Sequence, residues 1–264
     1  RINSQGKSLN QADFILTLMS VFWEEGRRAL EEFSHASRTP STNGASPYNH
    51  FIDPDPDQLL RVSVGLGFKR ARLRYAYNIL RGKNLETGKI SEERRIEQFN
   101  QLRDAQSTVL DLQNWHGYFQ ALKRAGFRRG KMVTSDMNLL YSYLMYLVGK
   151  REYELGEYRL REVIARWFFM CNITGRYTGS SESTMEEDLS RVEDVGSADA
   201  FVNILDRVIE SRLTSDFWSI TLPDKLDSKS YYSPTLFAYH AALNILDARA
   251  LFSKLKISEL LDPS

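Results

Sequence analysis

Apolar positions recur with a helical rhythm along most of this chain. Between residues 15 and 33 they fall every three or four positions, and the same spacing returns over residues 160–171 and 201–213. A period of 3.6 favours amphipathic α-helices, and few runs alternate as strands do. We therefore expect an all-α protein, a bundle of about eight to ten helices with buried central helices.

Two segments, residues 14–23 and 139–148, are apolar on nearly every face. A helix of that kind is normally buried within a larger body, so we expect residues 139–148 to be central. The first segment is the longest dense apolar run, and it is shorter than the roughly 20 residues that cross a bilayer. We therefore expect no membrane partner.

Capping residues predict where the helices begin and end. Ser8 with Gln11, and Ser183 with Glu186, have the spacing of a capping box, and Asp57 can cap a helix that runs to about residue 80. A second long helix is expected from residue 91 to about residue 125. Further signals are a C-terminal cap at Gly175, a start at Ser233 and Pro234, and a short last helix over residues 257–261.

The polar segment 34–47 holds two prolines and an Asn-Gly pair, which indicates a surface loop or linker. We place a domain boundary behind it, which separates residues 1–48 from a helical domain over residues 49–264. Two glycines, Gly65 and Gly67, interrupt the expected helix after Asp57 and weaken it by about 1 kcal/mol each relative to Ala.

Charge is balanced overall and clustered locally. The chain has 35 basic and 34 acidic residues, so its net charge does not attract nucleic acid or membranes. Two stretches nevertheless lack acids. The first basic cluster comprises Arg61, Lys69, Arg70, Arg72, Arg74, Arg81 and Lys83, with Arg70, Arg74 and Arg81 expected on one helical face; the second comprises Lys123, Arg124, Arg128, Arg129 and Lys131.

Such clusters are typical of proteins that bind the phosphate backbone of DNA. The alternatives are a solvated surface, or pairing with the acidic segment 182–194.

No residue pattern indicates catalysis or a resident cofactor. The single cysteine, Cys171, lies in an apolar stripe, where a buried, inert thiol is expected, and one cysteine fits a reducing cytoplasm. The four histidines are scattered and lack metal-ligand spacing, so we predict no metal site, and His240 is expected in the core. The aspartates of residues 53–57 lack the glycine and glutamate of a calcium loop.

One loop could attract an anion. Residues 175–183 read GRYTGSSES, and Arg176, Ser180, Ser181 and Ser183 could supply donors where a helix begins. The alternative is purely structural, a glycine cap that ends one helix followed by a serine cap that begins the next.

Several long segments carry a family resemblance. RINSQGKSLNQADFILTLMS, PDPDQLLRVSVGLGFKRARLRY, LVGKREYELGEYRLREVIARWFFMCNITGRYTGSSES, LTSDFWSITLP and ALFSKLKISELLDPS together span most of the chain. The ensemble resembles the GmrSD-like, modification-dependent restriction endonucleases. Those proteins have a ParB- and sulfiredoxin-like N-terminal domain and a C-terminal HNH nuclease domain.

The resemblance implies that this chain is the helical middle of a nucleotide-dependent endonuclease for phage defence. Residues 1–48 would include the tail of the ParB-like domain, with the DGQQR signature before Arg1 and the HNH domain after Ser264. Neither catalytic motif occurs in these residues, so no catalytic residue is transferred.

Three hypotheses follow. In the first, the chain connects the flanking domains of the longer nuclease and contacts DNA. In the second, it is a spacer or a homodimerisation platform. In the third, which is least favoured, it is an enzyme that uses Cys171 or the loop 175–183.

Overall fold

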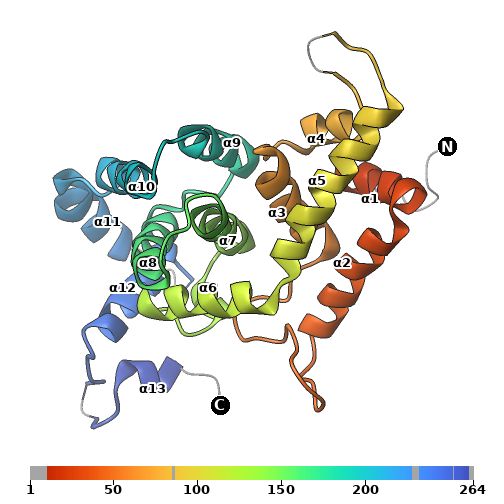
Figure 1. Cartoon of the computed structure of the whole chain (residues 1–264). Helices are drawn as coiled ribbons and strands as arrows, with labels where there is room; N and C mark the ends of the chain where they lie inside the picture. Colours follow the sequence, from red (N-terminus) through yellow and green to blue (C-terminus); the bar gives the residue numbers. More distant parts are fainter. Residues whose placement is uncertain (1–10, 85–86, 228–231, 252, 262–264) are drawn as a thin grey trace, which may run out of the picture.

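The computed structural model describes residues 11–84, 87–227, 232–251 and 253–261, and this part of the chain is all-α (Figure 1). It contains thirteen α-helices and no strand, and the only β-pairing consists of two isolated bridges. The prediction of an all-α protein is therefore confirmed, whereas the expected number of eight to ten helices is wrong. The number is higher because several expected long helices break in the middle. Ser8 lies outside the described residues.

The N-terminal helical pattern is split in two. α1 (Gln11–Phe22) and α2 (Glu24–Ser37) are separated by Trp23, whose φ of −161° is not helical. The Trp23 indole lies so close to α2 that a Cβ on Gly26 would overlap it. α2 also continues through Ser34 to Ser37, both buried, so the expected loop begins only at residue 38.

The expected helix over residues 57–80 is also two helices, α3 (Pro56–Phe68) and α4 (Leu73–Leu80). Lys69 ends α3 in the left-handed region, with a φ of 52°, and the chain turns there. The cap of α3 is Asp55, in a capping box with Gln58, and not Asp57. Because Arg70 lies between the helices, it does not share a helical face with Arg74 and Arg81.

The third break is at Asp111, between α5 (Glu92–Leu110) and α6 (Leu112–Arg124). Asp111 has an extended ψ of 117°, and its side chain accepts a hydrogen bond of 2.9 Å from the Gln113 amide. This cap satisfies a free donor of the first turn of α6. The chain therefore changes direction sharply between α5 and α6 (Figure 1).

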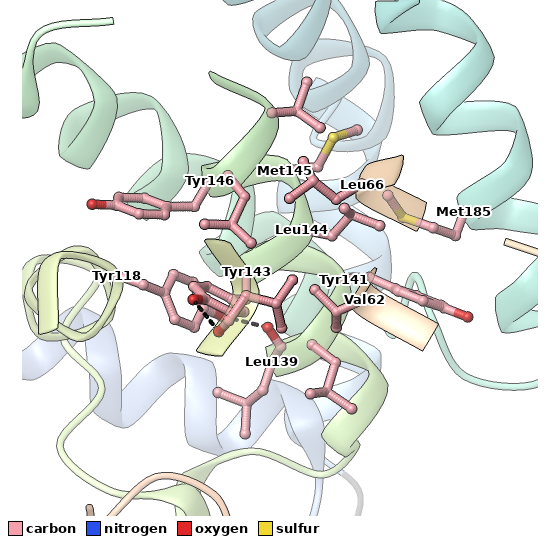
Figure 2. Close-up of a cluster of buried hydrophobic side chains, with 14 of the residues drawn as sticks. Val62, Leu66, Tyr118, Leu139, Tyr141, Tyr143, Leu144, Met145, Tyr146 and Met185 are labelled. Carbon is pink, nitrogen blue, oxygen red and sulfur yellow. Dashed lines mark hydrogen bonds between the residues drawn. The ribbon is translucent and has the colours of Figure 1, made fainter. Parts of the chain in front are cut away.

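α7 (Asp136–Arg151) is the central helix, as predicted, and every residue from Asn138 to Gly149 is buried. It follows a 3₁₀ turn, Gly130–Met132, and packs against α3 and against α8 (Glu157–Thr174). Tyr143 and Tyr146 pack on Tyr118 of α6, and Tyr141 points to the opposite side (Figure 2). The Tyr118 hydroxyl donates to the Leu139 carbonyl over 2.7 Å. The Tyr118 hydroxyl thus remains paired inside an apolar core.

The remaining helices extend to the C-terminus. They are α9 (Ser181–Val192), α10 (Ala198–Arg212), α11 (Leu222–Leu226), α12 (Pro234–Ile245) and α13 (Ile257–Leu261), with a π-helical turn at Phe217–Thr221. The predicted end at Gly175 and the predicted start at Ser233–Pro234 are confirmed. His240 on α12 is partly exposed, so its predicted place in the core is wrong; partial burial lowers its pKa.

A single main core joins both sides of the expected domain boundary. Ile15, Met19 and Leu30 belong to the same buried cluster as the side chains of α3 to α10. The boundary at residue 48 falls in the connection between α2 and α3, but it marks no gap between two cores. The origin of residues 1–48 in a ParB-like domain stays a prediction.

Candidate nucleic-acid interface

The first basic cluster is partly neutralised by α9. The Arg61 guanidinium forms an ion pair with Glu182 and lies 4.0 Å from the Asp57 carboxylate, and its side chain is only 17% exposed. Arg70 Nε lies 3.8 Å from Glu186 Oε1. Pairing with the acidic segment 182–194, one of the alternatives left by the sequence, therefore applies to these two arginines.

Glu186 has a structural role that differs from the predicted one. Its Oε2 accepts hydrogen bonds from the backbone amides of Ala71, at 2.5 Å, and Arg72, at 3.1 Å. Ser183, its expected capping partner, lies inside α9 and accepts a hydrogen bond of 3.2 Å from Arg72. The capping box at Ser183 and Glu186 is therefore wrong, because Ser180 occupies the cap position and Glu186 holds the α3–α4 connection instead.

The other cations of the first basic cluster divide into paired and exposed. Lys69 forms an ion pair with Glu152 and donates to the Leu66 carbonyl over 2.8 Å, which anchors the end of α3. Arg74 and Arg81 are exposed and lie over the rings of Tyr75 and Tyr77, at 4.8 Å and 5.6 Å. Lys83 is exposed as well, and within the described residues these last three cations form no ion pair.

The second basic cluster also contains both paired and exposed cations. Arg124 is paired with Glu162 and lies 5.0 Å over the Tyr158 ring. Lys123 and Lys131 are exposed and Arg129 is half-buried, and none of the three forms an ion pair with a residue that the structure describes. Both basic clusters therefore keep exposed cations that no acid among the described residues neutralises.

A pocket of about 410 Å³ adjoins the second basic cluster. The described residues of its lining include no carboxylate and are Asn49, His50, Phe51, His116, Phe119, Gln120, Lys123 and Arg128. Neither histidine belonged to a predicted site. They are 66 residues apart in the sequence (116 − 50), so no local spacing pointed to them.

The anion-site candidates of residues 175–183 are not brought together. The Arg176 side chain is 3% exposed, and its Nε donates to Asp188 Oδ2 over 2.9 Å. Ser180, Ser181 and Ser183 instead line a surface pocket of about 520 Å³ that Arg176 does not line. The structural alternative accounts for the caps at Gly175 and Ser180.

Asp188 is the centre of a buried polar group that the sequence did not reveal. It also accepts a hydrogen bond of 2.8 Å from the Tyr177 hydroxyl. Burial opposes the charge of Arg176, but its hydrogen bonds and attraction to Asp188 more than offset this, so the pKa of Arg176 is raised. Arg176 is therefore already paired with Asp188, and this pair holds α9 against the core.

Cys171 is fully buried, as predicted, and burial raises the pKa of its thiol well above the ordinary value. Among the residues that the structure describes, no group of three His, Cys, Asp or Glu side chains could hold a metal ion. No helix in the same part of the chain has the length and apolar character required to cross a membrane.

The fold and these surfaces define an all-α protein with two basic surfaces, each of which combines paired and exposed cations. No protein-family model, curated protein or solved structure matches this chain.

Proposed function

We propose that this chain is the helical connecting module of a modification-dependent restriction or phage-defence nuclease, and that it contacts the DNA backbone through the second basic cluster. The family resemblance of its long segments supports the first half. The second half is carried by one observation, namely three cations, Lys123, Arg129 and Lys131, that no described acid neutralises on an open surface.

Backbone contact fits this surface better than base reading does. Lysine and arginine neutralise phosphates irrespective of sequence, and the release of counterions makes the binding depend on salt. Arg74, Arg81 and Lys83 are exposed in the same way and could extend the contact, whereas Arg61, Lys69 and Arg70 are already paired.

Duplex DNA binding across a series of salt concentrations tests the proposal. The triple variant Lys123→Glu, Arg129→Glu and Lys131→Glu should bind at least about tenfold more weakly at low salt, with a salt slope lower by about two to three. The matched control reverses three exposed cations elsewhere, Arg207, Arg212 and Lys225, and changes the net charge equally. Equal losses in both triple variants would remove the second basic cluster from the proposal.

A second candidate function, a spacer or homodimerisation platform, is favoured by an apolar groove of about 710 Å³. It lies between α8, α10 and α12, and exposed Trp218, Ile245 and Leu246 contribute to its lining. Light scattering combined with a mobility shift at low salt separates the two. A monomer that shifts DNA supports the connecting module that contacts DNA, and a dimer that leaves DNA unshifted supports the platform.

A further inference from the structure

The pocket beside the second basic cluster has the chemistry of an anion site. His50, His116, Lys123 and Arg128 line it with nitrogen-bearing side chains, and among the residues that the structure describes no carboxylate does. Two imidazoles alone could suggest a transition metal. The charge of Lys123 opposes a cation, however, and favours a phosphate group, which can accept hydrogen bonds from Lys123 and from both imidazoles.

Aromatic rings also line the pocket, beside its nitrogen-bearing side chains. Phe51 and Phe119 are stacked with ring centroids 5.2 Å apart and planes 16° apart, and both line the pocket. The exposed Tyr48 ring lies 5.7 Å from His50, in an edge-on arrangement. Flat apolar surfaces next to phosphate donors suit a ligand with a planar base and a phosphate.

The pocket is held in shape by its backbone. Asn49 Oδ1 accepts hydrogen bonds from the amides of Phe51, at 2.7 Å, and Ile52, at 2.9 Å, which fixes the turn that presents His50. The Gly130 amide donates to the His50 carbonyl over 2.8 Å. A Cβ on Gly130 would overlap the Phe51 carbonyl oxygen, so this glycine lets the loop that carries Arg128 approach the turn.

The side chains from α6 share one exposed face. His116, Gln120 and Lys123 are three or four residues apart, so they project from the same side of the helix toward the turn. The pocket thus combines two segments that are distant in the sequence, residues 49–51 and 116–128, and its volume of about 410 Å³ lies in the range of small-ligand sites.

We propose that this pocket binds one nucleoside phosphate unit, with the phosphate held by Lys123 and the two imidazoles and the base lying against the aromatic rings. The unit is either a free nucleotide or an unpaired nucleotide within a strand. This inference deepens the proposed function and rests on it, because Lys123 belongs both to the pocket and to the second basic cluster. His50 and His116 belong to the pocket alone.

Calorimetric titration of the full chain tests the inference, with deoxyadenosine monophosphate, deoxyadenosine, inorganic phosphate and a short single-stranded oligonucleotide as probes. The monophosphate or the oligonucleotide should bind, and the double variant His50→Ala and His116→Ala should bind at least about tenfold more weakly. The control is His35→Ala, an exposed histidine on α2. Circular dichroism confirms that each variant is folded.

The probes distinguish a free nucleotide from an unpaired nucleotide within a strand. Binding of the monophosphate identifies a free nucleotide as sufficient, and binding of the oligonucleotide alone identifies a strand. The inference is overturned if neither the monophosphate nor the oligonucleotide binds. It is also overturned if the wild type and the double histidine variant bind these probes equally well.

Duplex binding by the same variants separates this inference from the proposed function. The histidine variants should retain duplex binding. If duplex binding follows the charge reversals and no nucleotide binds, only the pocket inference fails. If the nucleotide binds and duplex DNA does not, only the proposed backbone contact fails.

Discussion

At the scale of single residues, Asp188 belongs to the most deeply buried ion pair among the described residues. Its side chain is fully buried and holds the guanidinium of Arg176, which is 3% exposed. Removing one partner of a buried ion pair leaves the other charge without compensation in a poorly solvated place.

We therefore expect Asp188→Asn to lower the free energy of unfolding by about 3–5 kcal/mol, measured by urea denaturation. The control is Asp206→Asn, which breaks the exposed pair between Asp206 and Arg166, where the side chains are 34% and 50% exposed. An exposed pair contributes about 0–1 kcal/mol. Similar losses in the two variants would contradict the importance of burial.

Gly65 shows how the meaning of a residue depends on its neighbour. From the sequence it is a weak position in a helix, but in the structure it faces α7, and a Cβ there would overlap Leu144 Cδ2. The glycine therefore allows α3 and α7 to pack closely, which compensates for its poor helix propensity.

Gly65→Ala should consequently destabilise the protein, by about 1–3 kcal/mol, although alanine is the better helix former. The second substitution Leu144→Ala makes room for the new methyl group, so the double variant should be more stable than the sum of the two single losses predicts. Thermal or urea unfolding of all four proteins measures this coupling, and strict additivity would show that the two residues do not interact.

At the scale of elements, α9 controls the charge of the first basic cluster. Its Glu182 and Glu186 pair with Arg61 and Arg70, which come from α3 and the connection to α4. The sequence showed an acidic and a basic segment, but it could not show whether they meet, because about 110 residues separate them. Only the packing of α9 against α3 and α4 decided this.

The variant Glu182→Gln and Glu186→Gln should therefore bind duplex DNA more tightly than the wild type at low salt. Glutamine keeps an acceptor oxygen for Arg61 and for the backbone amides, while the arginines lose their counter-charge. The salt slope should steepen by about 0.9 for each additional phosphate that the protein neutralises. Glu187→Gln, which removes an α9 carboxylate that pairs within the helix with Arg191, serves as the control. Unchanged affinity in the double variant would exclude a latent DNA-binding role for the first basic cluster.

The sequence predicted which segments are helical, but it did not predict where the long helices are interrupted. The 3.6-residue rhythm continues through Trp23, residues 69–72 and Asp111, although the backbone leaves the helix at each of them. At Trp23 the indole packs over Gly26, and at Asp111 the side chain caps the next helix. Periodicity reports which positions are apolar, and it does not register a local break whose cause is a tertiary contact or a cap.

At the scale of the whole molecule, the tyrosines of the core link stability to alkaline pH. Burial raises the pKa of Tyr141 to about 12, and it raises the pKa values of Tyr118, Tyr143 and Tyr177 well above their ordinary range. The unfolded chain has tyrosine pKa values of about 10, so above that pH it loses protons that the folded protein keeps.

The free energy of unfolding should accordingly fall as the pH rises above about 10, with the contribution of Tyr141 lost between about 10 and about 12. Urea denaturation at a series of pH values measures this slope. Tyr141→Phe should reduce it with little loss at neutral pH, because the Tyr141 hydroxyl has no hydrogen-bond partner among the described residues. An unchanged slope in this variant would mean that Tyr141 does not contribute.

The sequence predicted the basic residues of the candidate interface, but it did not predict the pocket that adjoins them. The acid-free stretch 123–131 identified Lys123, Arg128, Arg129 and Lys131. The pocket beside it also needs His50 and His116, and these come together only because the turn after Asn49 packs against α6 and the loop at Gly130.

By itself, the sequence determined the helical class, the central position of residues 139–148 and the burial of Cys171. These properties depend on the local period and apolar character of the chain, which each segment carries with it. The tertiary structure alone decided which basic residues are paired and which are open, because that outcome depends on acids brought from other helices. It also assembled the pocket of His50, His116 and Lys123, since two distant segments meet there and neither holds the site on its own.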